Sequence, residues 1–302
     1  MPGARTKTAG FLILDKPGGM TSREAVDRAL GWFPRGTRGG HAGTLDPAAT
    51  GVLVLCLGTA TRLAEYVQRM KKSYLAVLRL GARSDTDDKE GAITVDTNAA
   101  PPSHDSVSDC LQGFIGEIEQ VPPAFSAAKV SGQRAYALAR GGHDVALNPR
   151  SVQVYQMRLL DYQFPRLEIE VVCGKGTYIR SLARDLGQNL GCGALLDSLR
   201  RSRIGVFDIE QAVPLDASTE TARSRLLPLS TAVAELPSIS ADPETIARLR
   251  QGQAVPLTLD AHRPIESVDS ADVAIYDENN VLCAVASRDD SGPLLRPKKV
   301  FA

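Results

Sequence analysis

The order of apolar and polar residues along the chain predicts a mixture of strands and helices. Apolar runs of strand length occupy residues 11–14 and 51–57, and further strands are predicted near 74–80, 151–160 and 167–173. The intervening segments do not repeat the strand–helix–strand rhythm of a doubly wound parallel sheet. The pattern therefore favours a mixed α/β fold around one main sheet.

Capping residues and helical spacing predict two helices in the first part of the chain. Thr21 and Glu24 have the spacing of a capping box, and apolar residues follow at helical intervals. A further helix is predicted over residues 106–115, opened by Ser106.

The middle of the chain changes character between residues 122 and 150. This segment begins with two prolines, and we interpret it as an excursion from the core that contains a short helix near 134–140. Ile179 begins another predicted helix. Gly187 and Gly191 are expected to end it, because glycine is common just past a helix C-terminus.

The end of the chain is predicted to form a separate module, with a boundary near Pro237. Asp242 is expected to cap a helix that has proline in its first turn. Two apolar runs flank the turn residues 277–280, which predicts a hairpin. We therefore expect one large domain over residues 1–236 and a small strand-rich module over 237–302.

Composition and charge narrow the class of protein. The 302 residues carry 35 basic and 35 acidic side chains, and a net charge of zero argues mildly against a nucleic-acid binder. The charge is unevenly distributed: residues 237–302 have a net charge of −3, and residues 1–236 have a net charge of +3. A polyanion should therefore bind to residues 1–236. Five cysteines without a C-x-x-C pair are typical of reduced thiols. With no apolar run of membrane-spanning length, we expect a soluble cytoplasmic protein.

Several common chemistries find no support in the sequence. The run GKGT over residues 174–177 has the look of a phosphate-binding loop, but a glycine follows its lysine where that loop has Ser or Thr. The four histidines are too far apart along the chain for a local metal motif. The residues alone therefore give no local motif for a metal or a cofactor, although folding could still bring some of the histidines together.

The most informative run is GGHAGTLDP over residues 39–47. It places Asp46 directly before Pro47, and a residue before proline is held away from helical backbone angles. Asp46 can thus face a cleft in one extended conformation, and Gly43 permits the close approach of backbone or ligand. The residues alone leave open that Asp46 only caps the next element.

Four motifs in order resemble those of the TruB family of tRNA pseudouridine-55 synthases. They are LDKPGGMTS at residues 14–22, GHAGTLDP at 40–47, KSY at 72–74 and KGTYIR at 175–180. The resemblance extends over residues 10–214. It implies a largely antiparallel sheet of the pseudouridine-synthase type with flanking helices, a C-terminal module of the PUA type, and a reaction without a cofactor.

The resemblance also implies roles for three residues. Asp46 matches the family nucleophile, Arg180 matches the arginine that pairs with it, and Tyr74 matches the tyrosine that packs on the target base and is proposed to remove its C5 proton. A nearby guanidinium favours an ionised carboxylate, and an aromatic ring can stack on any pyrimidine. Taken without the motifs, Arg180 could be a surface arginine and Tyr74 a core tyrosine.

Further positions match residues that support the loop or contact RNA. Lys16 and Pro17 lie in the first motif, and Lys16 is expected to brace the loop that carries Asp46. Lys129 lies in the segment 122–150, which matches an insertion that closes over the tRNA arm. The resemblance implies substrate contacts from His41, Gly43, Thr44, Lys129, Lys175, Tyr178 and Leu199. The residues themselves leave open that His41 braces its loop and that Tyr178 and Leu199 are core residues.

The implied substrate is the T-arm of tRNA, in which one uridine, at the position called 55, is flipped out and isomerised. The resemblance implies a monomer that needs no protein partner. One alternative is a non-catalytic tRNA-binding or folding protein, and another is a guide-RNA-dependent synthase of the dyskerin type. The intact trio Asp46, Tyr74 and Arg180 argues against the first, and the match to stand-alone family members argues against the second.

Overall fold

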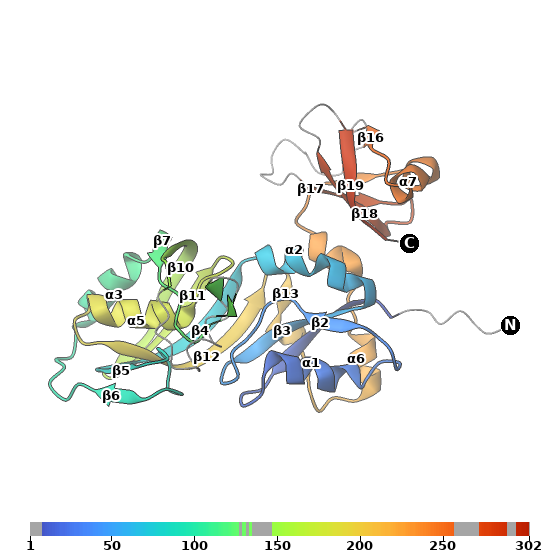
Figure 1. Cartoon of the computed structure of the whole chain (residues 1–302). Helices are drawn as coiled ribbons and strands as arrows, with labels where there is room; N and C mark the ends of the chain where they lie inside the picture. The colour runs from blue at the N-terminus through green and yellow to red at the C-terminus, as the bar shows by residue number, and fades with distance from the viewer. Residues whose placement is uncertain are drawn as a thin grey trace.

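One large sheet extends through the body of the molecule (Figure 1). The computed structural model describes residues 8–126, 147–256, 272–288 and 294–301, together with the short strands β8 (Lys129–Val130) and β9 (Gln133–Arg134). Within these residues the sheet has ten strands. In order along its path they are β14 (Val213–Pro214), β1 (Gly10–Lys16), β3 (Thr50–Leu57), β12 (Ala194–Ile204), β4 (Lys72–Leu80), β11 (Arg166–Cys173), β10 (Arg150–Gln163) and β7 (Gly116–Gln120), with β2 (Gly39–His41) paired to β3 and β13 (Phe207–Asp208) paired to β12.

Most neighbouring strands in this sheet are antiparallel. β1 runs antiparallel to β3, and β4 runs antiparallel to both β11 and β12. Two pairs are parallel, β3 with β12 and β1 with β14. The sheet is therefore mixed and largely antiparallel, which confirms the fold class expected from the sequence.

Helices cover the sheet in two halves that meet at β4 and β12. On one half, α3 (His104–Gln112) and α5 (Ile179–Asn189) share a core with β4, β10 and β11. On the other half, α1 (Ser22–Leu30) and α6 (Thr219–Ser224) cover one face of β1 and β3. The opposite face of β1 and β3 packs on the 3-10 helices η1 (Gly58–Leu63) and η3 (Leu229–Val233) and on α2 (Ala64–Arg69). Side chains alternate along β1 and β3, so each strand supplies both cores.

Short elements connect these layers. β5 (Ala82–Ser84) and β6 (Ile93–Val95) form a separate antiparallel pair, and η2 (Ile209–Gln211) follows β13. The loop between β5 and β6 contains Asp87, whose φ of 62° is unusual for a residue other than glycine. This loop lies beside α5, because Arg184 of that helix pairs with Asp87 at 2.9 Å.

Several local predictions are confirmed. Thr21 and Glu24 form both hydrogen bonds of a capping box at the start of α1. Asp242 caps α7 (Pro243–Arg250) through the amide of Thr245. The five predicted strands are present, and the hairpin around residues 277–280 joins β17 (Asp272–Tyr276) to β18 (Leu282–Arg288).

Two helix boundaries were predicted wrongly. Ser103, and not Ser106, caps α3, because the Ser103 hydroxyl accepts a hydrogen bond from the Ser106 amide at 3.1 Å. Gly187 lies inside α5 and does not end it. A Cβ at this position would stand 2.1 Å from the backbone nitrogen of Ala194, so the glycine lets α5 pack directly on the start of β12. The helix expected near 134–140 falls mostly outside the described residues.

A five-stranded sheet follows after Pro237, with the order β15 (Ser238–Ser240), β17, β18, β19 (Leu294–Val300) and β16 (Val255–Pro256). Its own core contains Ile239, Leu249 and Val273. The module rests on η1 and α2 of the body (Figure 1). Arg62 donates to the carbonyl of Val300 at 2.7 Å, and Phe301 enters the core beneath α2.

Candidate functional site

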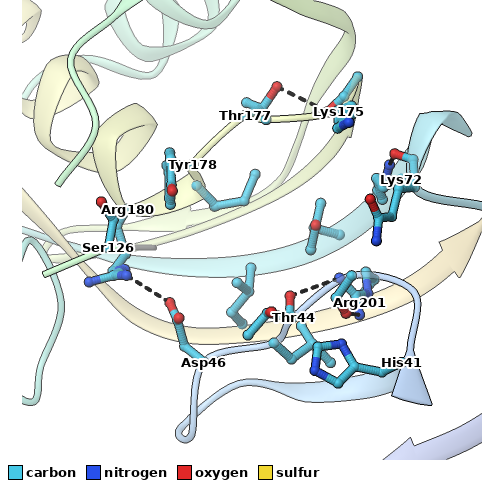
Figure 2. A pocket seen from close by; sticks show the side chains of 18 of the residues that line it. His41, Thr44, Asp46, Lys72, Ser126, Lys175, Thr177, Tyr178, Arg180 and Arg201 are labelled. Carbon is cyan, nitrogen blue, oxygen red and sulfur yellow. Dashed lines mark hydrogen bonds and ion pairs between the residues drawn. The ribbon is translucent and has the colours of Figure 1, made fainter. Parts of the chain in front are cut away.

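A pocket of about 540 Å³ opens where the two halves of the main sheet meet. Figure 2 shows that its lower wall is the loop from His41 to Asp46, and that β4 and the segment leading into α5 form the opposite wall. The pocket therefore joins segments that are far apart along the chain. Its described lining includes His41, Gly43, Thr44, Leu45, Asp46, Gln68, Lys72, Tyr74, Phe125, Ser126, Arg150, Lys175, Tyr178, Arg180, Leu199 and Arg201.

Asp46 lies in a loop whose backbone is held at both neighbouring residues. The buried Ser22 hydroxyl accepts a hydrogen bond from the Leu45 amide at 2.8 Å and donates one to the Leu45 carbonyl at 2.9 Å. On the other side, the Lys16 ammonium donates to the Pro47 carbonyl at 3.1 Å. The Asp46 side chain itself remains 46% exposed, so the carboxylate is presented on a fixed backbone.

Arg180 reaches Asp46 from the first turn of α5. Its Nη2 lies 3.0 Å from Asp46 Oδ2, and its side chain is only 7% exposed. The same guanidinium donates to the carbonyls of Thr86 and Phe125, and it lies 3.4 Å from the carboxylate of Asp88. These partners fix the guanidinium in one place, so the carboxylate of Asp46 has one defined direction.

Tyr74 is buried in β4 with its ring on the pocket. The register of the sheet places it directly opposite Arg201 of β12. Burial raises the pKa of the Tyr74 hydroxyl, and the Arg201 guanidinium opposes that rise. The trio predicted from the sequence, Asp46, Tyr74 and Arg180, therefore lines one pocket.

Most of the other expected residues also reach the pocket. Its lining includes His41, Gly43, Thr44, Lys175, Tyr178 and Leu199. Lys129 lies in β8, and its side chain is outside the described residues. Lys16 is fully buried below the loop, where its ammonium also donates to the carbonyls of Pro17 and Met20. It ties the loop after Asp46 to the end of β1 without lining the pocket.

Sequence reasoning missed several charged residues of the site. Arg150 places its guanidinium 4.7 Å from the centre of the Tyr178 ring, and it donates to the Gly176 carbonyl at 2.6 Å. Asp88 stands in an acidic turn that the sequence does not connect to Arg180. Arg201 lies in the run LRR at residues 199–201, which also resembles a family motif, but only the sheet register reveals that it faces Tyr74. Lys72, which begins the KSY motif, also lines the pocket.

Burial lowers the pKa of three basic groups in or below the pocket, Lys72, Lys16 and His41. Burial lowers the pKa of Lys72 to about 8, and the nearby Arg201 charge adds to this effect. Burial likewise lowers the pKa of Lys16 to about 8, although the charge of Asp46 works in the opposite direction. The pKa of His41 falls below its ordinary value through burial, and then through the charges of Arg201 and Arg23. His41 is therefore a neutral imidazole at pH 7.

The arrangement supplies groups for covalent and acid–base chemistry on a flat polar substrate. It offers a half-exposed carboxylate, a buried guanidinium and an aromatic ring. Within the described ranges, no three His, Cys, Asp or Glu side chains converge as metal ligands would. In the same part of the chain, no helix is long and apolar enough to cross a membrane.

Comparison with protein families identifies what this chain is similar to. Residues 33–179 match the family model described as TruB family pseudouridylate synthase, N-terminal domain. Residues 180–234 match the model described as tRNA pseudouridylate synthase B C-terminal domain. The two matches are contiguous and cover the pocket.

Curated relatives and solved structures agree with these matches. The chain is 44% identical over 250 residues to a tRNA pseudouridine synthase B of Ruegeria sp. (strain TM1040), covering 81% of this chain and 82% of the relative. It is 41% identical over 298 residues to one of Dehalococcoides mccartyi (strain ATCC BAA-2100 / JCM 16839 / KCTC 5957 / BAV1), covering 97% and 96%. A crystal structure of a Cbf5-Nop10-Gar1 complex contains a similar chain, with a TM-score of 0.76 and 27% identity over 97% of this chain and 85% of that one.

Proposed function

The chain belongs to the TruB family of tRNA pseudouridine synthases, which are isomerases, and from this premise we propose that its substrate is one uridine in the T-arm of tRNA. The uridine is the one at the position that family members call 55, and Asp46 is the nucleophile. The observation that carries the proposal is the ion pair of Asp46 with the buried Arg180 inside the pocket. The ion pair directs the carboxylate, which stays open to a substrate.

The isomerisation moves the ribose from N1 to C5 of the same uracil ring, so it needs no oxidant and no second substrate. The bond from C1′ to N1 breaks, and its electron pair leaves with the uracil. The carboxylate of Asp46 forms a bond to either the sugar or the base, and that part stays held in the pocket while the uracil turns. C5 then bonds to C1′, the bond to Asp46 breaks and returns its electron pair to the carboxylate, the C5 proton leaves and N1 gains a proton, so the product is an isomer of the substrate.

Tyr74 and Arg180 have distinct roles in this scheme. The Tyr74 ring stacks on the uracil face, and its hydroxyl receives the C5 proton, directly or on its way to solvent. Arg180 positions the Asp46 carboxylate before and during the attack. Both roles follow from contacts with the pocket that these side chains share.

The uridine must leave the RNA stack before it can react, at a cost of roughly a few kcal/mol. His41 lies on the loop wall of the pocket, where an RNA group can meet its imidazole. Lys175 and Arg150 lie at the opposite rim and face a polyanion. Because phosphate contacts release counterions, affinity should fall with salt.

Two further parts of the chain enter the proposal. Residues 122–150, with Lys129, form an insertion that grips the tRNA arm, and it emerges from the segment that supplies the Phe125 carbonyl to Arg180. Residues 237–302 form a PUA-like module, separate from the catalytic domain over 1–236. The separate five-stranded sheet and its own core support this division.

The test is to map pseudouridine in a T-arm hairpin and in whole tRNA, after incubation with the purified chain alone. We expect one modified uridine with the wild type and none with Asp46→Asn, which should still bind the RNA. Asp27→Asn, an exposed aspartate that pairs with Arg23, is the matched control and should leave turnover unchanged.

The outcomes separate the alternatives. Binding without product in the wild type would favour a non-catalytic tRNA-binding protein. Product that appears only after addition of a guide RNA and other proteins would favour a guide-dependent synthase. Full activity of Asp46→Asn would remove Asp46 as the nucleophile.

A further inference from the structure

Arg201 is the largest fully buried side chain of the described residues, and it belongs to the central strand β12. Its guanidinium donates to three backbone carbonyls and spans two segments. Nε donates to the Val52 carbonyl at 2.8 Å, at the start of β3. Nη2 donates to the Gly43 carbonyl at 3.0 Å and Nη1 to the Thr44 carbonyl at 3.3 Å. Arg201 therefore ties the loop that carries Asp46 to the middle of the main sheet.

The backbone of Arg201 is in close contact with the backbone of β3. Gly51 lies beside it in the parallel pairing of β3 with β12, and a Cβ on Gly51 would stand 2.2 Å from the Arg201 carbonyl oxygen. Ser22 holds Leu45, Lys16 holds Pro47, and the Ala49 amide donates to the Asp46 carbonyl at 3.1 Å, so the loop backbone is held at every residue from 43 to 47. The direction of the Asp46 side chain is then set by Arg180.

The burial of Arg201 is unusual for a charged side chain. Within the parts of the chain that the structure describes, no carboxylate pairs with it, and its hydrogen-bond partners are neutral: three backbone carbonyls and the Tyr74 side chain. Burying a charge without a counter-ion costs free energy. We therefore expect this charge to serve the chemistry of the site. Its field reaches Tyr74, His41 and Lys72, because the guanidinium lowers the pKa of each.

We propose that Arg201 is a second positioning arginine of the reaction, which fixes the reach of Asp46 and provides a buried positive charge beside Tyr74 for the uracil that leaves with an electron pair. The inference rests on the proposed function and extends it. Arg180 acts on the carboxylate from outside the loop, whereas Arg201 acts from below on the loop backbone. The neutral carbonyl partners leave its charge available to an anion.

Three substitutions separate the two parts of this role. Arg201→Lys keeps the charge but cannot reach three carbonyls, Arg201→Gln keeps one donor without the charge, and Arg201→Met loses both. Arg158→Gln is the control, because Arg158 lies exposed on β10 and pairs with Glu170 away from the pocket. For each variant the single-turnover rate of pseudouridine formation with saturating enzyme is compared with RNA affinity from filter binding, and folding is followed by thermal melting.

We expect Arg201→Lys to lower the single-turnover rate by about 100-fold, as a small misplacement of the nucleophile does, and Arg201→Gln and Arg201→Met to lower it further. RNA affinity should stay at the wild-type value, which a merely structural role would not predict. A wild-type rate in Arg201→Gln, or a parallel loss of rate and affinity, would overturn the inference. Failure of all three variants to fold would assign Arg201 to the fold and overturn it as well. An inactive wild type in the same assay would refute the proposed function itself.

Discussion

The pocket and the junction between the two sheets are built from the same three kinds of side chain and use them differently. In the pocket, Asp46, Arg180 and Tyr74 come together. At the junction, Tyr66 of α2 and Lys298 of β19 meet the carboxylate of Asp272 at 3.0 Å and 2.8 Å. In both places a carboxylate, a cation and a phenol converge.

The difference lies in which member is buried. In the pocket the cation is 7% exposed and the carboxylate 46% exposed, whereas at the junction Asp272 is 4% exposed and Lys298 46% exposed. Both oxygens of Asp272 accept hydrogen bonds, and Ser287 provides one more donor. Burial raises the pKa of the Asp272 carboxyl, but these donors outweigh it and hold the pKa below its ordinary value. A buried carboxylate whose two oxygens both accept hydrogen bonds, as in Asp272, supports structure. A half-exposed carboxylate, as in Asp46, can react with a substrate.

The largest expected effect is the loss of turnover when Tyr74 in the pocket is replaced. Tyr74→Leu removes both the ring and the hydroxyl, and we expect the rate to fall by about 10⁴-fold, at the upper end for loss of an acid–base group. Tyr66→Phe removes the matching hydroxyl at the junction and should leave the rate unchanged. Single-turnover assays of both variants make the test, and equal losses would end the distinction between the two sites.

The second-largest effect is expected from the removal of Arg180, the cation that pairs with Asp46. Arg180→Ala leaves Asp46 and Asp88 unpaired, and we expect a rate loss of about 10³-fold, comparable to the loss of a preorganised charged donor. Arg180→Lys keeps the charge without the fork and should recover part of the rate. RNA affinity from filter binding serves as the reference, because it should change far less. A near-wild-type rate in Arg180→Ala would contradict the role assigned here.

Substitutions at the junction should lower the free energy of unfolding and leave turnover unchanged. Asp272→Asn removes the charge that accepts hydrogen bonds from Tyr66, Ser287 and Lys298, and we expect a loss of about 2 kcal/mol in the free energy of unfolding. Asp161→Asn breaks an exposed pair with Arg166 and should cost less than about 1 kcal/mol. Urea unfolding measures both. A slower turnover in Asp272→Asn, at a temperature where the variant is folded, would show that the junction reaches the pocket.

The smallest effect concerns His41 and pH. The folded pKa of His41 is below 6.5, so an unfolded chain binds this proton first as the pH falls. Stability from the neutral imidazole is therefore complete above pH 6.5 and declines as the pH drops from 6.5 toward the folded pKa. Relative to His41→Gln, the wild type should lose stability within this window. Urea unfolding at pH 7.5, 6.0 and 5.0 checks it, and parallel curves would show that the histidine titrates normally.

The sequence by itself determined the local elements and the chemical candidates. Alternation and capping depend on neighbours within a few residues, so β1, β3, α1, α7 and the hairpin after β17 could be predicted. The motif around Asp46 also made its candidacy readable without any coordinates. The cap of α3 and the end of α5 were missed, because the first depended on the choice between two nearby serines and the second on the approach of β12.

Only the tertiary structure decided which charges meet. β12 was not predicted, since basic residues interrupt its apolar run, yet it forms the centre of the sheet and places Arg201 opposite Tyr74. Asp88 and the Phe125 carbonyl reach Arg180 from loops far away in sequence. Strand pairing is selected by the burial of whole faces, which no local pattern encodes. The chain alone could therefore name the proposed nucleophile Asp46, its partner Arg180 and the bracing Lys16, but it could not name Asp88, the Phe125 carbonyl or the place of Arg201 opposite Tyr74.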